Sequence, residues 1–462
     1  MAMDAAMEAK NEWESLPWAT RASLFMSIAS LISGKYRYLM NASTMLGQSK
    51  NAFQAEIDAP CEVVDFLRFG VYYADQIYRQ QPEASPEGEA LNRLVYRPLE
   101  GFVLAVSPFN FTALGANLST APAIMGNTVV WKPATTSLLS NYYFMRILTE
   151  AGLPAGVINF VPCRGADIGR YVANDSRMAG FHFTGSTEVF RSVWKRIGEN
   201  IDNYYSYPRL VGETGGKGFL FAHKSADISA LISALVRGAF EYSGQKCSAL
   251  SRAFIPVSIW AQVKERLLKE TAKLRAGDVE DFSNFLNAVI DKTSFDKLTK
   301  CIDEAKASPD AEVLCGGYDG SVGYFIYPAI IQAKKKEYPT MLEELFGPVL
   351  SIYVYDDNDI EEMLKYCDKS TPYALTGSVF AQDRTALAFM ESKLLNAAGV
   401  FYINDKPTGA VVGQHPFGGS RSSGTNEKTS HPQNLSRWTT AVSVKERITL
   451  EEGISYPFMA EK

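Results

Sequence analysis

Residues 101–131 read GFVLAVSPFNFTALGANLSTAPAIMGNTVVW, and this stretch decides the fold class. It is the longest stretch without a charged residue, and its length alone would suit a membrane span. Proline and asparagine interrupt it, at Pro108, Asn110, Asn117, Pro122 and Asn127. We therefore interpret it as a strand, a loop, a helix and a second strand of a buried α/β core, and we expect no membrane span.

The same alternation of apolar runs and helix-like segments continues along the chain. Up to residue 212 it predicts strands at 103–106, 128–131, 157–161 and 179–183, and helices at 113–125 and 138–150. Beyond residue 216 it predicts helices at 228–242 and 260–274 and strands at 253–257, 349–355 and 399–403. Alternating units favour a parallel, doubly wound sheet, so we expect an α/β protein with two domains of similar size.

The composition argues against several classes of partner. With 462 residues, 46% of them hydrophobic and 21% charged, the chain is typical of globular proteins with two or three domains. Its net charge of −5 gives no reason to expect a nucleic acid as partner. The six cysteines and four histidines are scattered, which predicts neither a disulfide framework nor a metal site. We identify no targeting signal in residues 1–12.

Cys247 is the strongest candidate for chemistry. It lies in the run GQKCSA, residues 244–249, after a predicted helix. An isolated cysteine is more often a small buried residue than a nucleophile. Here its neighbours are polar, and we expect the adjacent Lys246 and the backbone amides to favour the thiolate, which is the nucleophilic form.

Two other runs offer what such a nucleophile needs to act on a carbonyl group. Asn110 follows a predicted strand, and its amide could donate to a developing oxyanion together with the backbone N–H of Cys247. Glu213 follows the apolar pair at 210–211, and a carboxylate in an apolar cleft has a raised pKa suited to a general base. Alternatively, Asn110 is an ordinary turn residue and Glu213 is a solvated carboxylate at a strand end.

Weaker signals point to a phosphate-bearing cofactor and to a substrate loop. Residues 183–188, FTGSTE, predict a strand, a Gly turn and a helix capped by Ser186 or Thr187. The N-terminus of such a helix can receive a phosphate, although the GxGxxG fingerprint is absent. Lys132 could meet an adenosine ribose, with a solvated lysine as the default. Residues 408–410 and 416–420 are either structural turns or substrate-lining segments.

In this order, the runs resemble the aldehyde dehydrogenase superfamily over nearly the whole chain. The matching runs are SPFNF (107–111), WKP (131–133), FTGS (183–186), GETGGK (212–217), GQKCSA (244–249), EELFGPV (343–349) and PFGG (416–419). A narrower set resembles the Δ1-pyrroline-5-carboxylate dehydrogenases, also called glutamate γ-semialdehyde dehydrogenases: Phe111, Ser248, YINDK (402–406), TGA (408–410) and SGTN (423–426). The resemblance implies NAD-dependent oxidation of L-glutamate γ-semialdehyde to L-glutamate, through a cysteine thiohemiacetal and thioester, in proline catabolism.

The resemblance also implies a role for each matching residue. Cys247 would be the nucleophile, Asn110 the oxyanion donor and Glu213 the base for hydrolysis. Cofactor contacts are implied for Ser107, Lys132, Gly185, Ser186, Thr187, Glu188, Val189, Glu344 and Phe346. Substrate contacts are implied for Phe111, Ser248, Gly409, Ala410 and Phe417, of which Ala410 replaces a serine of similar animal proteins.

The implied architecture is a Rossmann-type NAD-binding domain at 1–214, a catalytic α/β domain at 215–415 and a return segment at 416–462. A small β oligomerisation arm would combine 83–97 with the C-terminal tail, which implies a homodimer or a higher homo-oligomer. Similar eukaryotic proteins suggest the mitochondrial matrix, and a bacterial source would mean the cytoplasm.

Several alternatives stay open. The substrate could be another acidic semialdehyde, such as a succinylated glutamate semialdehyde. A CoA-acylating dehydrogenase is less favoured, because Glu213 offers a base for hydrolysis. Similar proteins begin well upstream of residue 11, so we expect this sequence to start inside the family's fold. A truncated, non-catalytic paralogue is the alternative from a different class.

Overall fold

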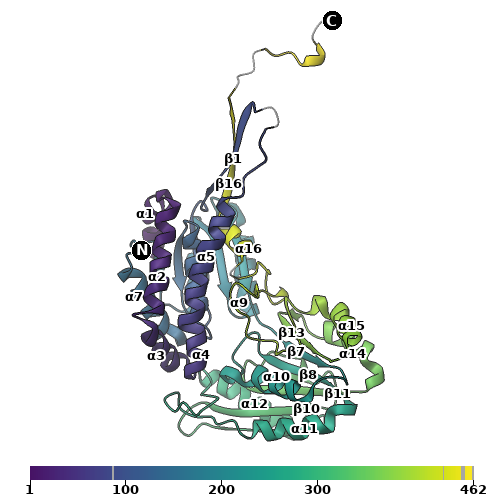
Figure 1. The fold of residues 1–462 in the computed structure, drawn as a ribbon. Helices are drawn as coiled ribbons and strands as arrows, with labels where there is room; N and C mark the ends of the chain where they lie inside the picture. The colour runs from purple at the N-terminus through teal and green to yellow at the C-terminus, as the bar shows by residue number, and fades with distance from the viewer. Residues whose placement is uncertain (86–87, 430, 449–452, 460–462) are drawn as a thin grey trace.

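The structure of the chain, a computed structural model, describes residues 1–85, 88–429, 431–448 and 453–459 (Figure 1). Its first sheet has five strands, all parallel, in the order β4-β3-β2-β5-β6. These strands are β2 (Phe102–Val106), β3 (Thr128–Lys132), β4 (Ile158–Phe160), β5 (Met178–Thr184) and β6 (Arg209–Glu213). The ends of β2 to β5 lie within one residue of the strands that the apolar runs predict.

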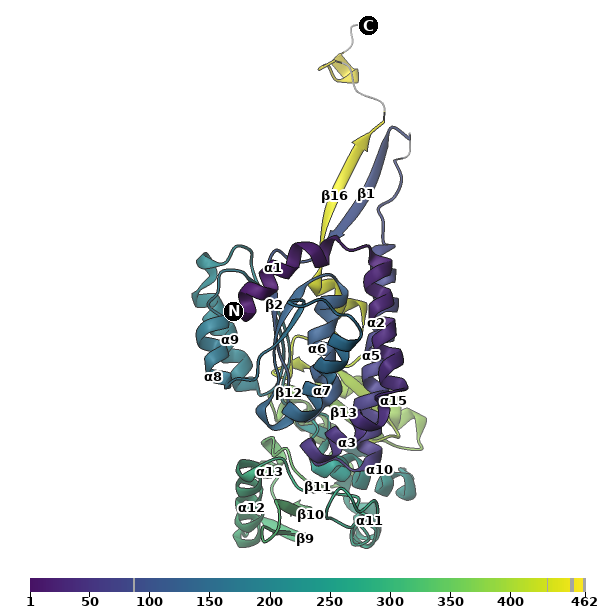
Figure 2. The same ribbon diagram turned by 90° about the vertical axis from the view of Figure 1, so that its left-hand side faces the viewer.

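Helices cover both faces of this sheet, and alternating side chains of β2 contribute to both cores (Figure 2). Val103 and Ala105 pack with residues of α2, α5, α6 and α7, whereas Phe102 and Leu104 pack with residues of α9. α6 is buried along nearly its whole length, which explains why the stretch 101–131 lacks charge. The helices of this half are α1 (Ala2–Ser15), α2 (Trp18–Ser33), α3 (Arg37–Gln48), α4 (Ala52–Glu56), α5 (Val63–Tyr78), α6 (Thr112–Ile124), α7 (Leu138–Glu150), α8 (Gly165–Asp167) and α9 (Thr187–Glu199).

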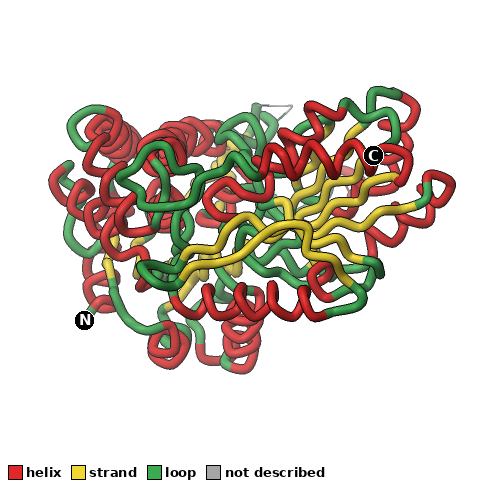
Figure 3. Tube along the Cα trace, turned by 90° about the horizontal axis from the view of Figure 1, so that it is seen from below, coloured by secondary structure: helices red, strands yellow, loops and turns green. Residues whose placement is uncertain are grey.

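The second sheet has seven strands in the order β14-β13-β7-β8-β11-β10-β9, parallel except for the edge strand β9. They are β7 (Gly218–Ala222), β8 (Leu250–Pro256), β9 (Ala311–Asp319), β10 (Phe325–Ala333), β11 (Val349–Tyr355), β13 (Thr376–Phe380) and β14 (Val400–Ile403). Seen from below, the strands fan out between two layers of helices (Figure 3). The chain crosses from the first sheet to the second between Glu213 and Gly218, where the expected domain boundary at residue 214 falls.

The helices of the second half pack on both faces of its sheet, with α10 and α11 in one core and α14 and α15 in the other. They are α10 (Ile228–Phe240), α11 (Val257–Thr271), α12 (Lys292–Ala307), α13 (Pro339–Leu342), α14 (Ile360–Lys369) and α15 (Arg384–Leu394). The helix expected at 228–242 ends at Phe240, because Tyr242 and Ser243 have left-handed backbone conformations, each with φ of 51°. The helix expected at 260–274 begins earlier, at Val257, directly after Pro256 ends β8.

A two-stranded ribbon projects from the first half of the molecule (Figure 1). It pairs β1 (Ala90–Arg97) with β16 (Thr440–Arg447) in antiparallel register. A shorter ladder joins β12 (Tyr373–Ala374) to β15 (Ser420–Arg421), and α16 (Pro432–Leu435) lies between β15 and β16 in the chain. In the described part of the chain, no helix is both long and apolar enough to cross a membrane.

Candidate active site

A cavity of about 480 Å³ lies at the carboxyl ends of the strands of the first sheet, where the two halves of the chain meet. Open α/β sheets bind their ligands in this position. Its walls include nine residues that the sequence implicates: Ser107, Asn110, Lys132, Gly185, Ser186, Val189, Cys247, Glu344 and Phe346. The cavity therefore gathers side chains that lie up to 239 positions apart in the chain.

Cys247 reaches the cavity wall from a tight turn between α10 and β8. Gly244 has a φ of +66°, and a Cβ at this position would overlap the carbonyl oxygen of Gly347. Left-handed backbone at Tyr242 and Ser243 reverses the chain just before it. The glycine is thus required both by its backbone conformation and by the close approach of a neighbouring strand end.

The Cys247 thiol is protonated at neutral pH in this state. Burial, followed by the charges of Glu344 and Glu213, raises the pKa of Cys247 to about 12. Backbone hydrogen bonds from Ser248 and from Cys247 itself act in the opposite direction and are weaker. The expectation that Lys246 favours the thiolate is wrong, because its ammonium group lies 3.2 Å from Oε2 of Glu241 and is paired there.

Asn110 comes from the loop between β2 and α6. Its side chain is 3% exposed, and its Nδ2 donates to the carbonyl oxygen of Gln245 at 3.1 Å. Gln245 precedes Cys247 by two residues, so the amide of Asn110 lies directly against the turn that carries the thiol. Asn110 and Cys247 both line the cavity.

Two carboxylates act on the thiol, one at the end of β6 and one in the loop between α13 and β11. Glu213, at the end of β6, accepts a hydrogen bond at Oε2 from the backbone N–H of Gly419 at 2.8 Å. Burial raises the pKa of Glu213 well above its ordinary value, in the direction that the sequence analysis expected. Glu344 accepts a hydrogen bond at Oε1 from the backbone N–H of Gly216 at 2.7 Å. Its pKa is also raised by burial.

The residues implicated in cofactor binding lie at the ends of β2 and β3, at the start of α9 and in the loop between α13 and β11. Ser186 is the N-cap of α9, where its Oγ accepts from the backbone N–H of Val189 at 3.4 Å. Thr187 and Glu188 lie in the first turn of α9, beside the cavity wall formed by their neighbours. Lys132 at the end of β3 is buried, and burial lowers the pKa of its amine.

Two further residues of the cavity wall, Ser107 and Phe346, complete the set implicated in cofactor binding. Ser107 accepts a hydrogen bond at Oγ from Nε1 of Trp131 at 3.0 Å, which fixes its side chain at the end of β2. Phe346 has a φ of +59° and packs edge-on against Phe109, with 5.7 Å between the ring centroids. Both residues thus have fixed orientations on the wall.

The residues implicated in substrate binding form a second group, beyond the walls of this cavity: Phe111, Ser248, Gly409, Ala410 and Phe417. Ser248 links two of their segments, because its Oγ lies 2.7 Å from Oγ1 of Thr408. Phe111 is half-buried and lies at the start of α6, and Phe417 lies in the loop that follows β14. No interaction between the two rings is seen among the described residues.

Thr408 is the residue that sequence reasoning missed in this group. It is 2% exposed and precedes Gly409 and Ala410 in the chain. Its position within the run TGA was the available signal, but its contact with Ser248 spans 160 positions and is visible only in three dimensions.

Comparison with known sequences shows what this chain is similar to. It matches the profile described as the aldehyde dehydrogenase family over residues 1–444. It is 54% identical over 464 residues to the "Delta-1-pyrroline-5-carboxylate dehydrogenase, mitochondrial" of Dictyostelium discoideum, covering 100% of this chain and 83% of that protein. It is 48% identical over 460 residues to the Homo sapiens protein of the same name, covering 99% of this chain and 81% of that protein.

Solved structures give the same picture. The Delta-pyrroline-5-carboxylate dehydrogenase of Mycobacterium tuberculosis bound with NAD superposes with a TM-score of 0.95 at 50% identity, covering 100% of this chain and 84% of that one. The 1-pyrroline-5-carboxylate dehydrogenase from Thermus with bound NAD has a TM-score of 0.90 at 31% identity, covering 97% and 85%.

Proposed function

Because this chain belongs to the aldehyde dehydrogenase family, we propose that it oxidises L-glutamate γ-semialdehyde to L-glutamate with NAD⁺ as oxidant, in proline catabolism. The aldehyde is the open form of Δ1-pyrroline-5-carboxylate. Relatives with 48% to 54% identity across the chain are named for that activity.

One observation carries the proposal. Cys247 lies on the wall of a cavity of about 480 Å³, with the amide of Asn110 against its turn and two carboxylates close enough to raise its pKa. A half-buried thiol with an amide donor and a carboxylate base nearby suits covalent oxidation of an aldehyde.

The cavity also fits a dinucleotide. Its volume lies within the range of about 300–1,000 Å³ that small-molecule sites occupy. The backbone N–H groups at the start of α9 suit a pyrophosphate, and the buried amine of Lys132 suits the hydroxyl groups of a ribose. Apolar side chains such as Phe181 and Val193 offer a surface for the adenine ring. NAD⁺, when bound, supplies the acceptor for the hydride.

The first half of the reaction forms a bond to sulfur. The Cys247 thiol first loses its proton, and the thiolate then attacks the aldehyde carbon, so that a C–S bond forms and the C=O π electrons move to oxygen. Nδ2 of Asn110 and the backbone N–H of Cys247 stabilise the oxyanion of this thiohemiacetal. Its collapse with loss of hydride restores the C=O bond and leaves a thioester on Cys247.

The second half consumes water. Glu213 takes a proton from a water molecule while the water oxygen attacks the thioester carbon. The C–S bond then breaks, glutamate leaves, and Cys247 returns as the thiolate. The raised pKa of Glu213 suits this role, because a carboxylate of higher pKa is a stronger base.

We assign substrate selection to the second group of residues. A semialdehyde with an α-carboxylate needs hydrogen-bond donors at one end and an apolar clamp along its methylene chain. The Ser248 hydroxyl, held by Thr408, and the backbone around Gly409 and Ala410 supply the donors. The rings of Phe111 and Phe417 supply the clamp.

The decisive assay measures NADH formation from Δ1-pyrroline-5-carboxylate by the wild-type protein and by Cys247→Ala. We expect turnover by the wild type and none by the variant. A panel that includes succinylglutamate semialdehyde and propanal tests the choice of substrate. Faster turnover of the succinylated compound would transfer the assignment to that substrate.

The non-catalytic alternative makes opposite predictions for the same protein. It expects no NADH from any aldehyde, no reaction of Cys247 with iodoacetamide and no thermal shift with NAD⁺. We expect Cys247 to be alkylated at alkaline pH and NAD⁺ to raise the melting temperature, because ligands that bind the folded state stabilise it.

We further propose a mitochondrial matrix location and a homodimeric or larger assembly. Support for the location comes from relatives that are named mitochondrial. If the source is bacterial, the proposed location is the cytoplasm. Support for the assembly comes from the projecting ribbon of β1 and β16, whose outer edges have no strand partner among the described residues.

A further inference from the structure

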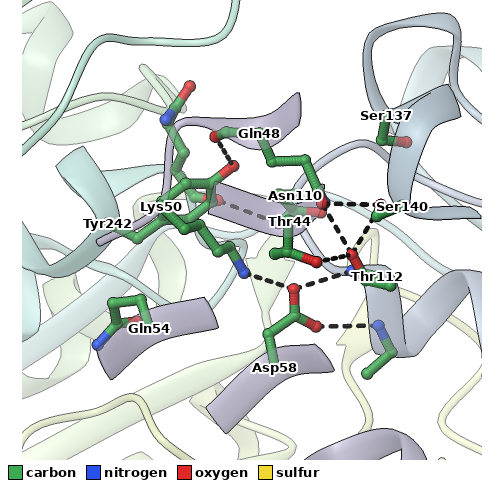
Figure 4. Close-up of polar contacts among 12 residues, drawn as sticks. Thr44, Gln48, Lys50, Gln54, Asp58, Asn110, Thr112, Ser137, Ser140 and Tyr242 are labelled. Carbon is green, nitrogen blue, oxygen red and sulfur yellow. Dashed lines mark hydrogen bonds and ion pairs between the residues drawn. The ribbon is translucent and has the colours of Figure 1, made fainter. Parts of the chain in front are cut away.

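A segment between α3 and α5 connects, through buried polar side chains, the two loops that carry Asn110 and Cys247. We call residues 48–58 the strut. Four of its residues are fully or nearly fully buried polar groups: Gln48, Lys50, Gln54 and Asp58. Figure 4 shows three of them, Gln48, Lys50 and Asp58, directed at the start of α6 and at Tyr242.

Asp58 binds the first turn of α6. Its Oδ2 accepts from the backbone N–H of Thr112 and its Oδ1 accepts from that of Ala113, each at 2.9 Å. α6 has no side-chain cap from its own N-cap residue, Phe111. A carboxylate from a distant segment therefore caps the helix that begins two residues after Asn110.

Lys50 balances the charge of Asp58. Its Nζ lies 2.8 Å from Oδ2 of Asp58, and the two side chains are 0% and 1% exposed. The same ammonium group lies 4.1 Å from the ring centroid of Phe111 and 4.4 Å from that of Tyr242. One cation thus contacts the residue after Asn110 and a residue of the turn that precedes Cys247.

Gln48 holds the other side of Asn110. Its Nε2 donates to the carbonyl oxygen of Phe109 at 2.5 Å, and its Oε1 accepts from Oγ1 of Thr112 at 2.7 Å. Its own carbonyl oxygen accepts from the hydroxyl of Tyr242 at 2.9 Å. The backbone is therefore held immediately before Asn110 and two residues after it.

From these contacts we propose that the strut sets the position of the Asn110 amide relative to Cys247, with Gln48, Lys50 and Asp58 as positioning residues. This inference rests on the proposed function. An oxyanion donor is effective only where its position is fixed before the reaction, and displacement of a fraction of an ångström weakens it. The strut supplies that fixation without touching the cavity.

The desolvation free energy that a buried ion pair costs supports the inference. Buried pairs often stabilise a fold no more than apolar residues of the same volume do. A pair is useful here because Asp58 must accept two backbone N–H groups at a helix N-terminus, which only a carboxylate does with both oxygens. Lys50 then offsets a charge that would otherwise be buried alone.

The test uses the double variant Lys50→Met/Asp58→Asn, which removes both charges and keeps both volumes. We expect kcat to fall about tenfold or more with KM nearly unchanged, since loss of a whole oxyanion donor costs about 10²–10³ in kcat. In the Asn110→Ala background the same change should have no further effect, because the strut acts through Asn110. Gln48→Leu, which leaves the ion pair intact, should lower kcat by severalfold.

Hydrogen exchange gives a readout that does not depend on activity. Peptides that cover residues 109–116 should exchange faster in the double variant, because an asparagine side chain has only one acceptor oxygen for the N–H groups of Thr112 and Ala113. The control is Ile302→Val in the buried core of α12, which should lower the melting temperature and leave kcat and this exchange unchanged.

The outcomes separate the two proposals. Unchanged exchange, or an equal loss of kcat with and without the Asn110 side chain, would overturn the strut. If the wild type oxidises no semialdehyde, the proposed function fails, and the exchange measurement still decides whether the strut orders the Asn110 loop.

Discussion

At the scale of single residues, the surroundings of Cys247 oppose its ionisation. Burial and the charges of Glu344 and Glu213 raise its pKa, and the adjacent Lys246 is paired with Glu241. The local sequence predicts Cys247 as the nucleophile, and the structure places this residue on the cavity wall. The partner of Lys246 was not predictable, because it depends on the turn at 241–244.

The first prediction concerns Glu344→Gln. Removal of this carboxylate should lower the pKa of Cys247, because Glu344 is the larger of the two charges that raise it. At pH 8 the alkylation of Cys247 by iodoacetamide, followed by peptide mass spectrometry, should quicken by about threefold or more. The exposed Cys61 serves as internal reference, and an unchanged rate at Cys247 would show that the charge of Glu344 does not raise its pKa.

The second prediction concerns Glu213→Gln. Its carboxylate is the proposed base and its pKa is raised, so the basic form is lost as pH falls through that raised value. Wild-type kcat should therefore rise with pH. In the variant this rise should be absent, and kcat near neutral pH should be lower by about 10²-fold or more. If kcat of the variant rises with pH as that of the wild type does, the base is another group.

The third prediction concerns Ala410→Ser. An added hydroxyl beside Gly409 should donate to the substrate carboxylate and lower KM for Δ1-pyrroline-5-carboxylate by about threefold to tenfold. Propanal, which lacks the carboxylate, is the control and should keep its KM. Equal KM values for the variant and the wild type with the natural substrate would show that this hydroxyl does not matter.

At the scale of elements, regular structure was predictable where burial on both faces leaves an unbroken apolar run. β2 and β3 are of this kind, and α7 ends at Glu150 because Gly152 and Pro154 follow. β9 gave no such signal, because it is an edge strand with mixed exposure. The strut was not predictable for another reason: its contacts to the Asn110 loop join residues 54 to 64 positions apart.

The fourth prediction tests the turn before Cys247. Gly244→Ala should lower the free energy of unfolding by about 1–2 kcal/mol or more, because alanine is strained at positive φ, and should reduce kcat as the thiol moves. Gly198→Ala is the matched control, since a Cβ there meets open space on α9 and favours the helix. Thermal denaturation and NADH formation measure both effects, and two indistinguishable variants would show that the turn adapts.

At the scale of the whole molecule, the ribbon of β1 and β16 stands away from both sheets (Figure 2). Leu91 and Val95 on it are 56% and 43% exposed, although isolated two-stranded ribbons are only marginally stable in water. A second copy of the chain would cover these side chains and pair the free edges. The sequence suggested such an arm only through family resemblance, since no local pattern says what covers a strand.

The fifth prediction follows from that exposure. The wild type should be a dimer or larger by light scattering after size-exclusion chromatography, and Leu91→Asp/Val95→Asp should shift it toward the monomer, because buried carboxylates oppose association. Val322→Asp, at a site 87% exposed on the second half, is the matched control and should leave the mass unchanged. If the ribbon variant keeps the wild-type mass, another surface holds the assembly together. If it becomes monomeric and still oxidises the semialdehyde at the wild-type rate per chain, the site is complete within one chain.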